Sequence, residues 1–146
     1  MITYSLAEAK DLEIIIELLQ SVHLPFGDVH DSEIEFIVAK NDSEIIGCIG
    51  LEKYGRHGLL RSFVVKESFQ NKGIGQGLYR QLLAFAGKEK VTTLHLLTTT
   101  ASSYFSRMGF VEAKRNEAPE LIGQTKEFSS LCPASSVYMT LEGLLK

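Results

Sequence analysis

The stretch from Leu59 to Gly75 contains the residues whose types and spacing are best suited to chemistry. An apolar run over Leu59–Val65 predicts a buried strand, and a loop leads from it to Gly73 and Gly75, where a helix is expected to begin. Glycines at a helix start let the backbone approach a ligand without a Cβ atom in the way. The unpaired N–H groups of the first helical turn then point toward an anion. Together with Lys72, they predict a site for a pyrophosphate.

Two common phosphate-binding motifs do not fit this spacing. A Walker A loop requires Gly-Lys-Ser or Gly-Lys-Thr, and the chain contains neither. A dinucleotide fingerprint requires glycine or alanine three residues after Gly75, where Leu78 stands. On the spacing alone, one alternative stays open: the two glycines only permit a tight turn between strand and helix.

The elements that position this loop follow from hydrophobic spacing and turn residues. Helices are predicted after Asp11, along Ile74–Phe85, over Ala101–Met108 with Gly109 as C-cap, and after Pro119. Strands are predicted over Ile2–Leu6, Glu35–Lys40, Glu44–Lys53, Leu59–Val65, Thr92–Thr98, Phe110–Ala113 and Val137–Leu141. This order predicts mixed α and β structure, with an antiparallel N-terminal part and a strand–helix–strand unit in the middle.

Composition narrows the function classes. The chain has 146 residues, the size of one ordinary domain. Its 15 Lys and Arg against 18 Asp and Glu argue against nucleic acid as the partner. Near Met1 there is no basic segment followed by an apolar core, and no apolar run approaches the ~18 residues of a membrane span, so we expect a cytoplasmic protein without a membrane partner. Cys48 and Cys132 are expected to be free thiols, and no metal-ligand spacing occurs.

The loop and its flanks resemble the GNAT superfamily of N-acetyltransferases, which bind acetyl-CoA. Gln70-Asn71-Lys72-Gly73-Ile74-Gly75 matches the family signature Gln/Arg-x-x-Gly-x-Gly/Ala, and Tyr104–Phe110 is similar to its recurring helix-to-strand segment ending in Gly-Phe. The resemblance implies a mixed, mostly antiparallel twisted α/β sheet (α+β), splayed at its centre and flanked by helices, in a single domain over residues 1–146. Selectivity must then come from this one fold or from a second copy in a homodimer.

The resemblance also implies how acetyl-CoA, the acetyl donor, is held. Backbone groups of Val64 and Val65 are expected to pair with the pantetheine arm as another strand does. The main-chain amides of Gln70, Asn71, Lys72, Gly73, Ile74 and Gly75 are expected to cradle the pyrophosphate. A neutral amine then attacks the acetyl carbonyl directly, and a backbone N–H near Val65 holds the developing oxyanion.

The usual acid and base residues of the family are displaced or absent. Phe105 stands where many members have the tyrosine that protonates the thiolate, and Tyr104 is offset by one residue, roughly 100° around a helix. Tyr104 is the candidate catalytic acid; the alternative is a packing or surface role. Leu60 stands where some relatives carry a glutamate base. A site without such a base suits an amine of low pKa, such as an α-amino group.

Three further positions are candidates for contact with the acceptor. Arg61 interrupts an apolar strand, which is costly unless its guanidinium is paired. It is predicted either to bind the carboxylate of an amino-acid-like substrate or to form a structural ion pair, for example with Glu35 or Glu52. Thr98 and Thr99 end a strand beside the expected cofactor groove and either line the pocket or are polar strand-end residues.

A closer resemblance, to the arsenic-resistance-associated acetyltransferases, is carried by Leu59–Ser62, Leu96–Ala101 and Thr125–Ser135. It implies a role in resistance to arsenicals or related toxins. Cys132 is interpreted as a packing residue rather than an arsenic ligand, and His95 is expected to be half-exposed because it alternates with leucines. The main hypothesis is an acetyl-CoA-dependent N-acetyltransferase; the alternative is a non-catalytic acyl-CoA sensor.

Overall fold

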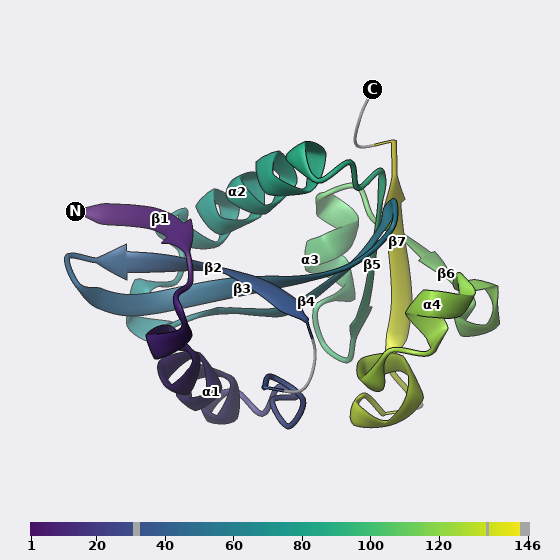
Figure 1. The fold of residues 1–146 in the computed structure, drawn as a ribbon, viewed down its shortest axis with the longest axis horizontal. Coiled ribbons are helices and arrows are strands. Elements are labelled where there is room, and N and C mark those ends of the chain that lie inside the picture. Colours follow the sequence, from purple (N-terminus) through teal and green to yellow (C-terminus); the bar gives the residue numbers. More distant parts are fainter. Residues whose placement is uncertain (31–32, 134, 144–146) are drawn as a thin grey trace. The chain divides into compact units, whose positions relative to one another are not determined.

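Seven strands form a mixed sheet in the order β1-β2-β3-β4-β5-β7-β6, with helices beside it (Figure 1). This computed structural model describes residues 1–30, 33–133 and 135–143 of the chain. The chain divides into two compact units, Met1–Glu52 with Leu60–Phe85 and Lys53–Leu59 with Ala86–Lys146, so strand β4 contributes residues to both. The predicted fold class, a mostly antiparallel sheet flanked by helices, is confirmed.

The first unit begins with an antiparallel meander. β1 (Ile2–Leu6) pairs with β2 (Ile34–Asn41), and β2 pairs with β3 (Glu44–Tyr54) through a register that shifts between Ala39 and Lys40. Asp42, in the left-handed region at φ 58°, lies in the tight turn between β2 and β3. The chain then forms β4 (His57–Val65) and turns into α2 (Ile74–Lys88).

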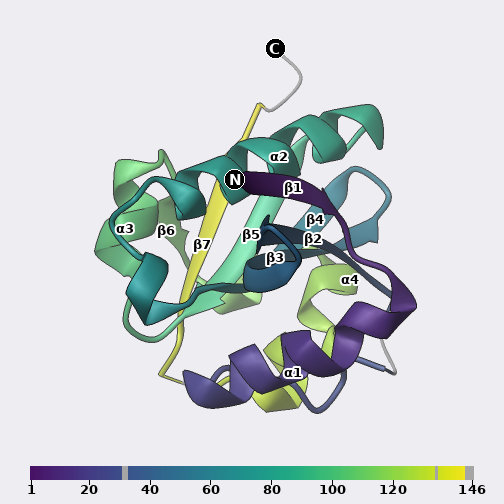
Figure 2. The same cartoon turned by 90° about the vertical axis from the view of Figure 1, so that its left-hand side faces the viewer.

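Two helices cover opposite faces of this meander, as both views show (Figures 1 and 2). On one face, α1 (Leu12–Ser21) packs Ile15, Leu18 and Leu19 into a buried cluster whose strand residues are Phe36, Val38, Ile45, Cys48 and Val64. On the other face, a Cβ atom built at Gly47 would lie 3.2 Å from Leu78 of α2. The alternation of side chains along β3 therefore sends Cys48 toward α1 and Gly47 toward α2.

Strand β1 also contacts α2, through Tyr4 and Gly77. A Cβ atom at Gly77 would lie 2.1 Å from the Tyr4 hydroxyl oxygen, closer than any pair of non-bonded atoms allows. Glycine at this helical position is intrinsically unfavourable by roughly 1 kcal/mol relative to alanine. Its presence here follows from the space that the phenol ring occupies.

The second unit is built on β5 (Thr93–Thr98), which pairs in parallel with β4 from His57↔Thr93 to Leu59↔His95. This pairing is the strand–helix–strand unit predicted from the sequence. β7 (Val137–Glu142) pairs antiparallel with β5 along its length and with β6 (Val111–Ala113).

Short helices connect these strands. α3 (Ser102–Arg107) is followed by Gly109 at φ 102°, as its predicted C-cap role requires. α4 (Glu120–Gly123) begins directly after Pro119, and a π-helical turn follows over Glu127–Leu131. Ile122 and Phe128 from these turns pack with Leu59 and Tyr138 in a second buried cluster. Ala134, which falls within the Thr125–Ser135 stretch, lies outside the described residues.

His95 is buried, with 2% of its surface exposed, so the prediction of a half-exposed side chain is wrong. Its Nδ1 lies 2.7 Å from the Tyr138 hydroxyl and its Nε2 lies 2.9 Å from His57 Nδ1. Both ring nitrogens therefore have partners, which removes most of the cost of burying a polar ring. Burial, and then repulsion from His57, lowers the pKa of His95 from 6.5 to about 4.

Within the described residues, no helix is both long enough and apolar enough to cross a membrane. The same part of the chain contains no group of three or more His, Cys, Asp and Glu side chains that could hold a metal ion.

We expect His95 to make stability depend on pH. Unfolded His95 binds a proton below about pH 6.5, whereas folded His95 stays neutral until about pH 4, so the free energy of unfolding decreases as the pH falls between these values. Urea unfolding of the parent chain and of His95→Gln should give a difference in unfolding free energy that is constant above pH 6.5. It should shrink by roughly 1–2 kcal/mol toward pH 4. A difference that stays constant from pH 7 to pH 4 would contradict this assignment.

Candidate acyl-CoA site

The loop after β4 is shaped by two residues in the left-handed region. A 3-10 helix over Glu67–Phe69 ends at Gln70, which is extended at φ −71° and ψ 159°. Asn71 follows at φ 62° and Gly73 at φ 81°, and α2 then begins at Ile74. Asparagine and glycine are the residues that tolerate this conformation best. Left-handed residues within a turn are typical of backbone nests, in which successive N–H groups face one anion.

The backbone N–H groups of residues 71–76 are available for such an anion. The first helical hydrogen bond at this end of α2 runs from Gly77 N–H to the Gly73 carbonyl. Among the described residues, no acceptor contacts the N–H groups of Asn71 through Gln76. The loop is exposed from Gln70 to Gly73, so these donors are reachable from solvent. Open amides at the start of a long helix make an anion-binding site without any charged side chain.

Side chains hold the loop against the end of β4. The Gln70 side-chain amide donates to the Val65 carbonyl over 2.9 Å, which ties the start of the loop to the last residue of the strand. The Lys72 ammonium lies 5.5 Å from the centre of the Phe69 ring, a cation–π contact that keeps its charge beside the open amides. Lys66 pairs with Glu44 at 2.8 Å.

A cleft of about 510 Å³ lies beside this loop within the first unit. One wall is formed by α1 and the residue after it, and the other by the end of β4 with the loop. The lining residues are Ile14, Glu17, Leu18, Ser21, Val22, Val64, Val65, Lys66, Glu67 and Gln70. Three residues expected to bind the donor, Val64, Val65 and Gln70, therefore line one cleft. Its volume is within the ~300–1,000 Å³ range of small-molecule sites.

Arg61 is fully buried and its guanidinium is paired inside the protein. Nη1 and Nη2 donate to the two carboxylate oxygens of Asp28 at 2.6 Å each, and Nη1 also donates to Glu52 at 2.7 Å. The side chains of all three residues are at most 2% exposed. The Glu52 ion pair considered from the sequence is thus present, and Asp28, from the segment between α1 and β2, adds a bidentate partner. The substrate-binding role of Arg61 stays a prediction.

Comparison with models of known protein families shows to which family the chain belongs. A model of the acetyltransferase (GNAT) domain matches residues 32–112, from β2 through the loop and α2 to β6. The chain belongs to the GNAT family. The matched region contains every element that shapes the loop and the β4 side of the cleft.

Individual relatives agree with this family. An uncharacterized N-acetyltransferase of Chlorobaculum tepidum is 35% identical over 60% of the chain and 57% of its own length. An amino-acid acetyltransferase of Ralstonia nicotianae is 31% identical over 58% of the chain and 19% of its own length. The matched stretch thus spans little more than half of one relative and a fifth of the other. N-acetylglutamate synthase of Neisseria gonorrhoeae, solved with coenzyme A and N-acetyl-glutamate, has the same fold, with a TM-score of 0.80 at 20% identity over 97% of the chain and 35% of that protein.

The remaining candidate residues of this GNAT chain lie in the second unit. Thr98 ends β5, and its hydroxyl accepts a hydrogen bond from the Ala101 N–H at 3.0 Å, while Thr99 is exposed. Tyr104 on α3 is 36% exposed and makes an edge contact with Phe105, which is buried. Burial raises the pKa of Tyr104 above its ordinary value, while Arg107 acts in the opposite direction, so the hydroxyl is protonated at neutral pH.

Leu60, which stands at the position of the family's glutamate base, is 2% exposed and apolar. The sequence interpretation missed Asp28 as a partner of Arg61 and the α1 side of the cleft. A signal for the last was present: in the run Ile14-Ile15-Ile16, only Ile15 is fully buried, and Ile14 faces the cleft with 42% of its surface exposed. Asp28 carried no signal, because it contacts Arg61 from 33 positions away.

Removing the Arg61 guanidinium is expected to destabilise the protein strongly. In Arg61→Met, Asp28 and Glu52 lose the cation with which they are buried, and the free energy of unfolding should fall by about 3–5 kcal/mol in urea denaturation. Arg80→Met, on the exposed side of α2, is the matched control and should change it by less than about 0.5 kcal/mol. Equal stabilities of the two variants would show that the buried ion pair is not needed.

Proposed function

We propose that the chain is an acetyl-CoA-dependent N-acetyltransferase that acetylates the amine of a small, amino-acid-like substrate. The observation that carries this proposal is the row of open backbone amides over residues 71–76 at the end of β4. Membership of the GNAT family supports the choice of acetyl-CoA as the anionic ligand. The name of the Chlorobaculum relative and the coenzyme A in the Neisseria structure point the same way.

In this proposal, the first unit holds the donor. The amides from Asn71 to Gly75 bind the pyrophosphate, and the Lys72 ammonium adds a charge beside them. The Gln70 N–H, which the resemblance also implied as a donor, donates instead to the Glu67 carbonyl at 3.2 Å. Backbone groups of Val64 and Val65 bind the pantetheine arm in the manner of an added strand. The side chain of Gln70 occupies the Val65 carbonyl, so the arm either displaces that amide or uses the N–H groups of the strand.

The reaction is a direct transfer between two bound molecules. The amine nitrogen forms a bond to the acetyl carbon, the carbon–sulfur bond breaks, and the thiolate of coenzyme A takes up a proton while the amine loses one. A backbone N–H near Val65 stabilises the oxyanion that develops on the carbonyl oxygen. Tyr104, protonated and partly exposed, is the proposed proton donor to the thiolate.

The acceptor is proposed to be a molecule with an amine of low pKa. Leu60 supplies no carboxylate base, so the amine must be neutral before it attacks. At pH 7 an α-amino group is neutral about a tenth of the time, whereas a lysine side chain is neutral only a few times in ten thousand. The amino-acid acetyltransferase of Ralstonia and the bound N-acetyl-glutamate of the Neisseria enzyme agree with an amino-acid-like acceptor. Thr98 and Thr99 are proposed to line its pocket. Binding of its carboxylate by Arg61 would require the guanidinium to exchange Asp28 or Glu52 for the substrate.

The wider role is proposed from sequence resemblance. Leu59–Ser62, Leu96–Ala101 and Thr125–Ser135 resemble the arsenic-resistance-associated acetyltransferases, which suggests acceptors that carry an arsinate or phosphinate group. We propose a cytoplasmic enzyme made of one domain over residues 1–146, acting alone or as a homodimer.

Gly73 provides a test of donor binding. Alanine at φ 81° is strained, so Gly73→Ala should shift the loop out of its left-handed turn and raise the Kd for coenzyme A about tenfold or more in titration calorimetry. Gly55→Ala is a matched control, because Gly55 has φ 64° and equally open surroundings but belongs to the β3–β4 turn and not to the loop. It should keep the Kd within about twofold. Equal weakening in both variants would contradict the assignment of the loop.

A panel of amines tests the transfer itself. Thiol release from acetyl-CoA should be fastest with α-amino compounds, among them amino acids with phosphinate or arsinate side chains and dipeptides, and slowest with polyamines and lysine side chains. Faster reaction of lysine side chains would contradict the proposed acceptor class. Coenzyme A binding without thiol release from any amine would favour the non-catalytic acyl-CoA sensor.

A further inference from the structure

The side-chain hydroxyl of Ser136, the residue directly before β7, is buried without a partner. Ser136 is only 6% exposed, and its hydroxyl oxygen has no hydrogen-bond partner among the described residues. Buried hydroxyl groups are hydrogen-bonded in the large majority of native proteins, so an unpaired one calls for an explanation. This hydroxyl can turn toward a ligand without giving up any bond within the described part of the chain.

The strand registers of the second unit place Ser136 between Thr99 and Arg115. β5 lies on one side of β7 and β6 on the other. When the β5–β7 register is continued by one residue, Thr99 stands opposite Ser136. When the β6–β7 register is continued by two residues, Arg115 stands opposite Ser136 from the other side. Side chains at directly opposite positions of neighbouring strands lie on the same face of a sheet.

The packing of the neighbouring residues agrees with this placement. Side chains on one face of a strand recur at every second residue. Two positions further into β5, β6 and β7, the residues on this face pack together in the second buried cluster: Leu97, Ala113 and Tyr138. Thr99, Arg115 and Ser136 therefore form the next row of the same face, at the edge of that cluster.

A shared acceptor brings the Arg115 side chain beside Ser136. The Arg115 Nη1 donates to the Pro133 carbonyl at 2.9 Å, and the Ser136 main-chain N–H donates to the same oxygen at 3.0 Å. The Arg115 Nη2 donates to the Phe128 carbonyl at 2.7 Å, and the guanidinium lies 5.6 Å from the centre of the Phe128 ring. These contacts hold the guanidinium in one place at the edge of the cluster.

The positive charge of Arg115 is not neutralised by a carboxylate within the described ranges of the chain. Its two hydrogen bonds go to main-chain carbonyls and use two of the five N–H donors of a guanidinium. Glu117, two residues further on, accepts a hydrogen bond from the Lys114 N–H at 3.2 Å. The guanidinium therefore keeps both a charge and donors for an anion.

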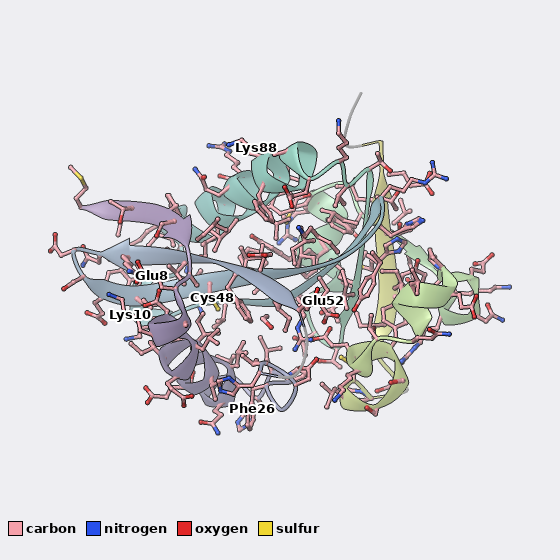
Figure 3. All side chains as sticks on the ribbon, viewed as in Figure 1. Glu8, Lys10, Phe26, Cys48, Glu52 and Lys88 are labelled. Carbon is pink, nitrogen blue, oxygen red and sulfur yellow. The ribbon has the colours of Figure 1, made fainter. Side chains whose placement is uncertain are left out.

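Arg61 differs in this respect, because two buried carboxylates already neutralise it. One of them belongs to Glu52, which Figure 3 labels on β3. The other, that of Asp28, accepts two hydrogen bonds from the same guanidinium. Of these two arginines, only Arg115 can bind an acidic group without first losing a carboxylate.

We propose that the acidic group of the acceptor binds in the second unit, to the Arg115 guanidinium and the hydroxyl groups of Ser136 and Thr99. The inference rests on the proposed acetyl transfer, since that function supplies an amino-acid-like acceptor. A guanidinium binds the oxygens of a carboxylate, a phosphinate or an arsinate, and hydroxyl groups add neutral donors. Thr99 is exposed, so the acceptor approaches from its side of the row.

The test compares acceptors that differ in their acidic groups. Glutamate has two carboxylates, glutamine and isoglutamine keep one each, the diamide of glutamate has none, and phosphinothricin carries a phosphinate. Arg115→Met should lower kcat/KM about tenfold or more for acceptors whose acidic group is bound, and less than about twofold for the diamide. Each ratio compares two chains with the same amine, so differences in amine pKa cancel.

The pattern of losses identifies the bound group. A loss with glutamine but not with isoglutamine assigns the α-carboxylate, and the reverse assigns the side-chain group, for which phosphinothricin then tests the phosphinate. Arg56→Met, an exposed arginine of the β3–β4 turn in the same unit, is the matched control. It should keep kcat/KM within about twofold for all five amines.

Ser136→Ala separates ligand binding from stability. Its hydroxyl has no partner among the residues that the structure describes, so its removal should leave the Tm unchanged or raise it. The variant should still lower kcat/KM about threefold or more for the acidic acceptors, without an effect on the diamide. Ser129→Ala, an exposed serine of the π-helical turn, should change neither quantity. A fall in Tm with unchanged kcat/KM would assign the hydroxyl to the fold and contradict the proposal.

The remaining outcomes separate this site from the proposed transfer. Equal losses with all five amines, or no loss in Arg115→Met, would overturn the site and leave the transfer intact. If the parent chain transfers to no amine, titration calorimetry of glutamate into its coenzyme A complex decides instead. Binding that is about tenfold weaker in Arg115→Met would support the site, and no binding to the parent chain would overturn it. If Arg115→Met does not fold, Ser136→Ala decides the question.

Discussion

The arrangement of the first unit depends on one buried guanidinium. Arg61 joins the segment after α1 through Asp28, strand β3 through Glu52 and its own strand through Ser62. Burying the charged side chains of Arg61, Asp28 and Glu52 away from water is costly, and the cost is offset only when the hydrogen-bond geometry is nearly ideal. The three segments are therefore held in one relative position, and the end of β4, from which the loop starts, is fixed with them.

From that anchored strand onward, the site relies on main-chain groups. The donors of residues 71–76 are amides, and the left-handed turn at Asn71 and Gly73 places them at the start of α2. A protein with a net charge of −3 can therefore still present N–H donors to an anion. The Lys72 ammonium, 5.5 Å from the centre of the Phe69 ring, adds a positive charge to the same loop.

The parts that the sequence could predict are those that residue type determines locally. The loop at Gly73 was predictable because glycine spacing and hydrophobic periodicity place a turn before a helix. The left-handed conformation of Ser62 in β4, at φ 57°, was not, because serine seldom adopts it and the Cys48 thiol that donates to its carbonyl lies on β3. For His95, alternation suggested partial exposure, but hydrogen bonds to His57 and Tyr138, 38 and 43 positions away, allow full burial. The ion-pair alternative for Arg61 was foreseeable with Glu52, whereas Asp28 required knowledge of the fold.

The contact between Tyr4 and Gly77 has a consequence for how this sequence can diverge. The phenol hydroxyl fills the space that a side chain at position 77 would need, so a methyl group there requires the Tyr4 ring to move or to be lost. Loss of the ring on β1 makes no such demand on position 77. The effect of a substitution on this turn of α2 therefore depends on a residue 73 positions earlier in the chain.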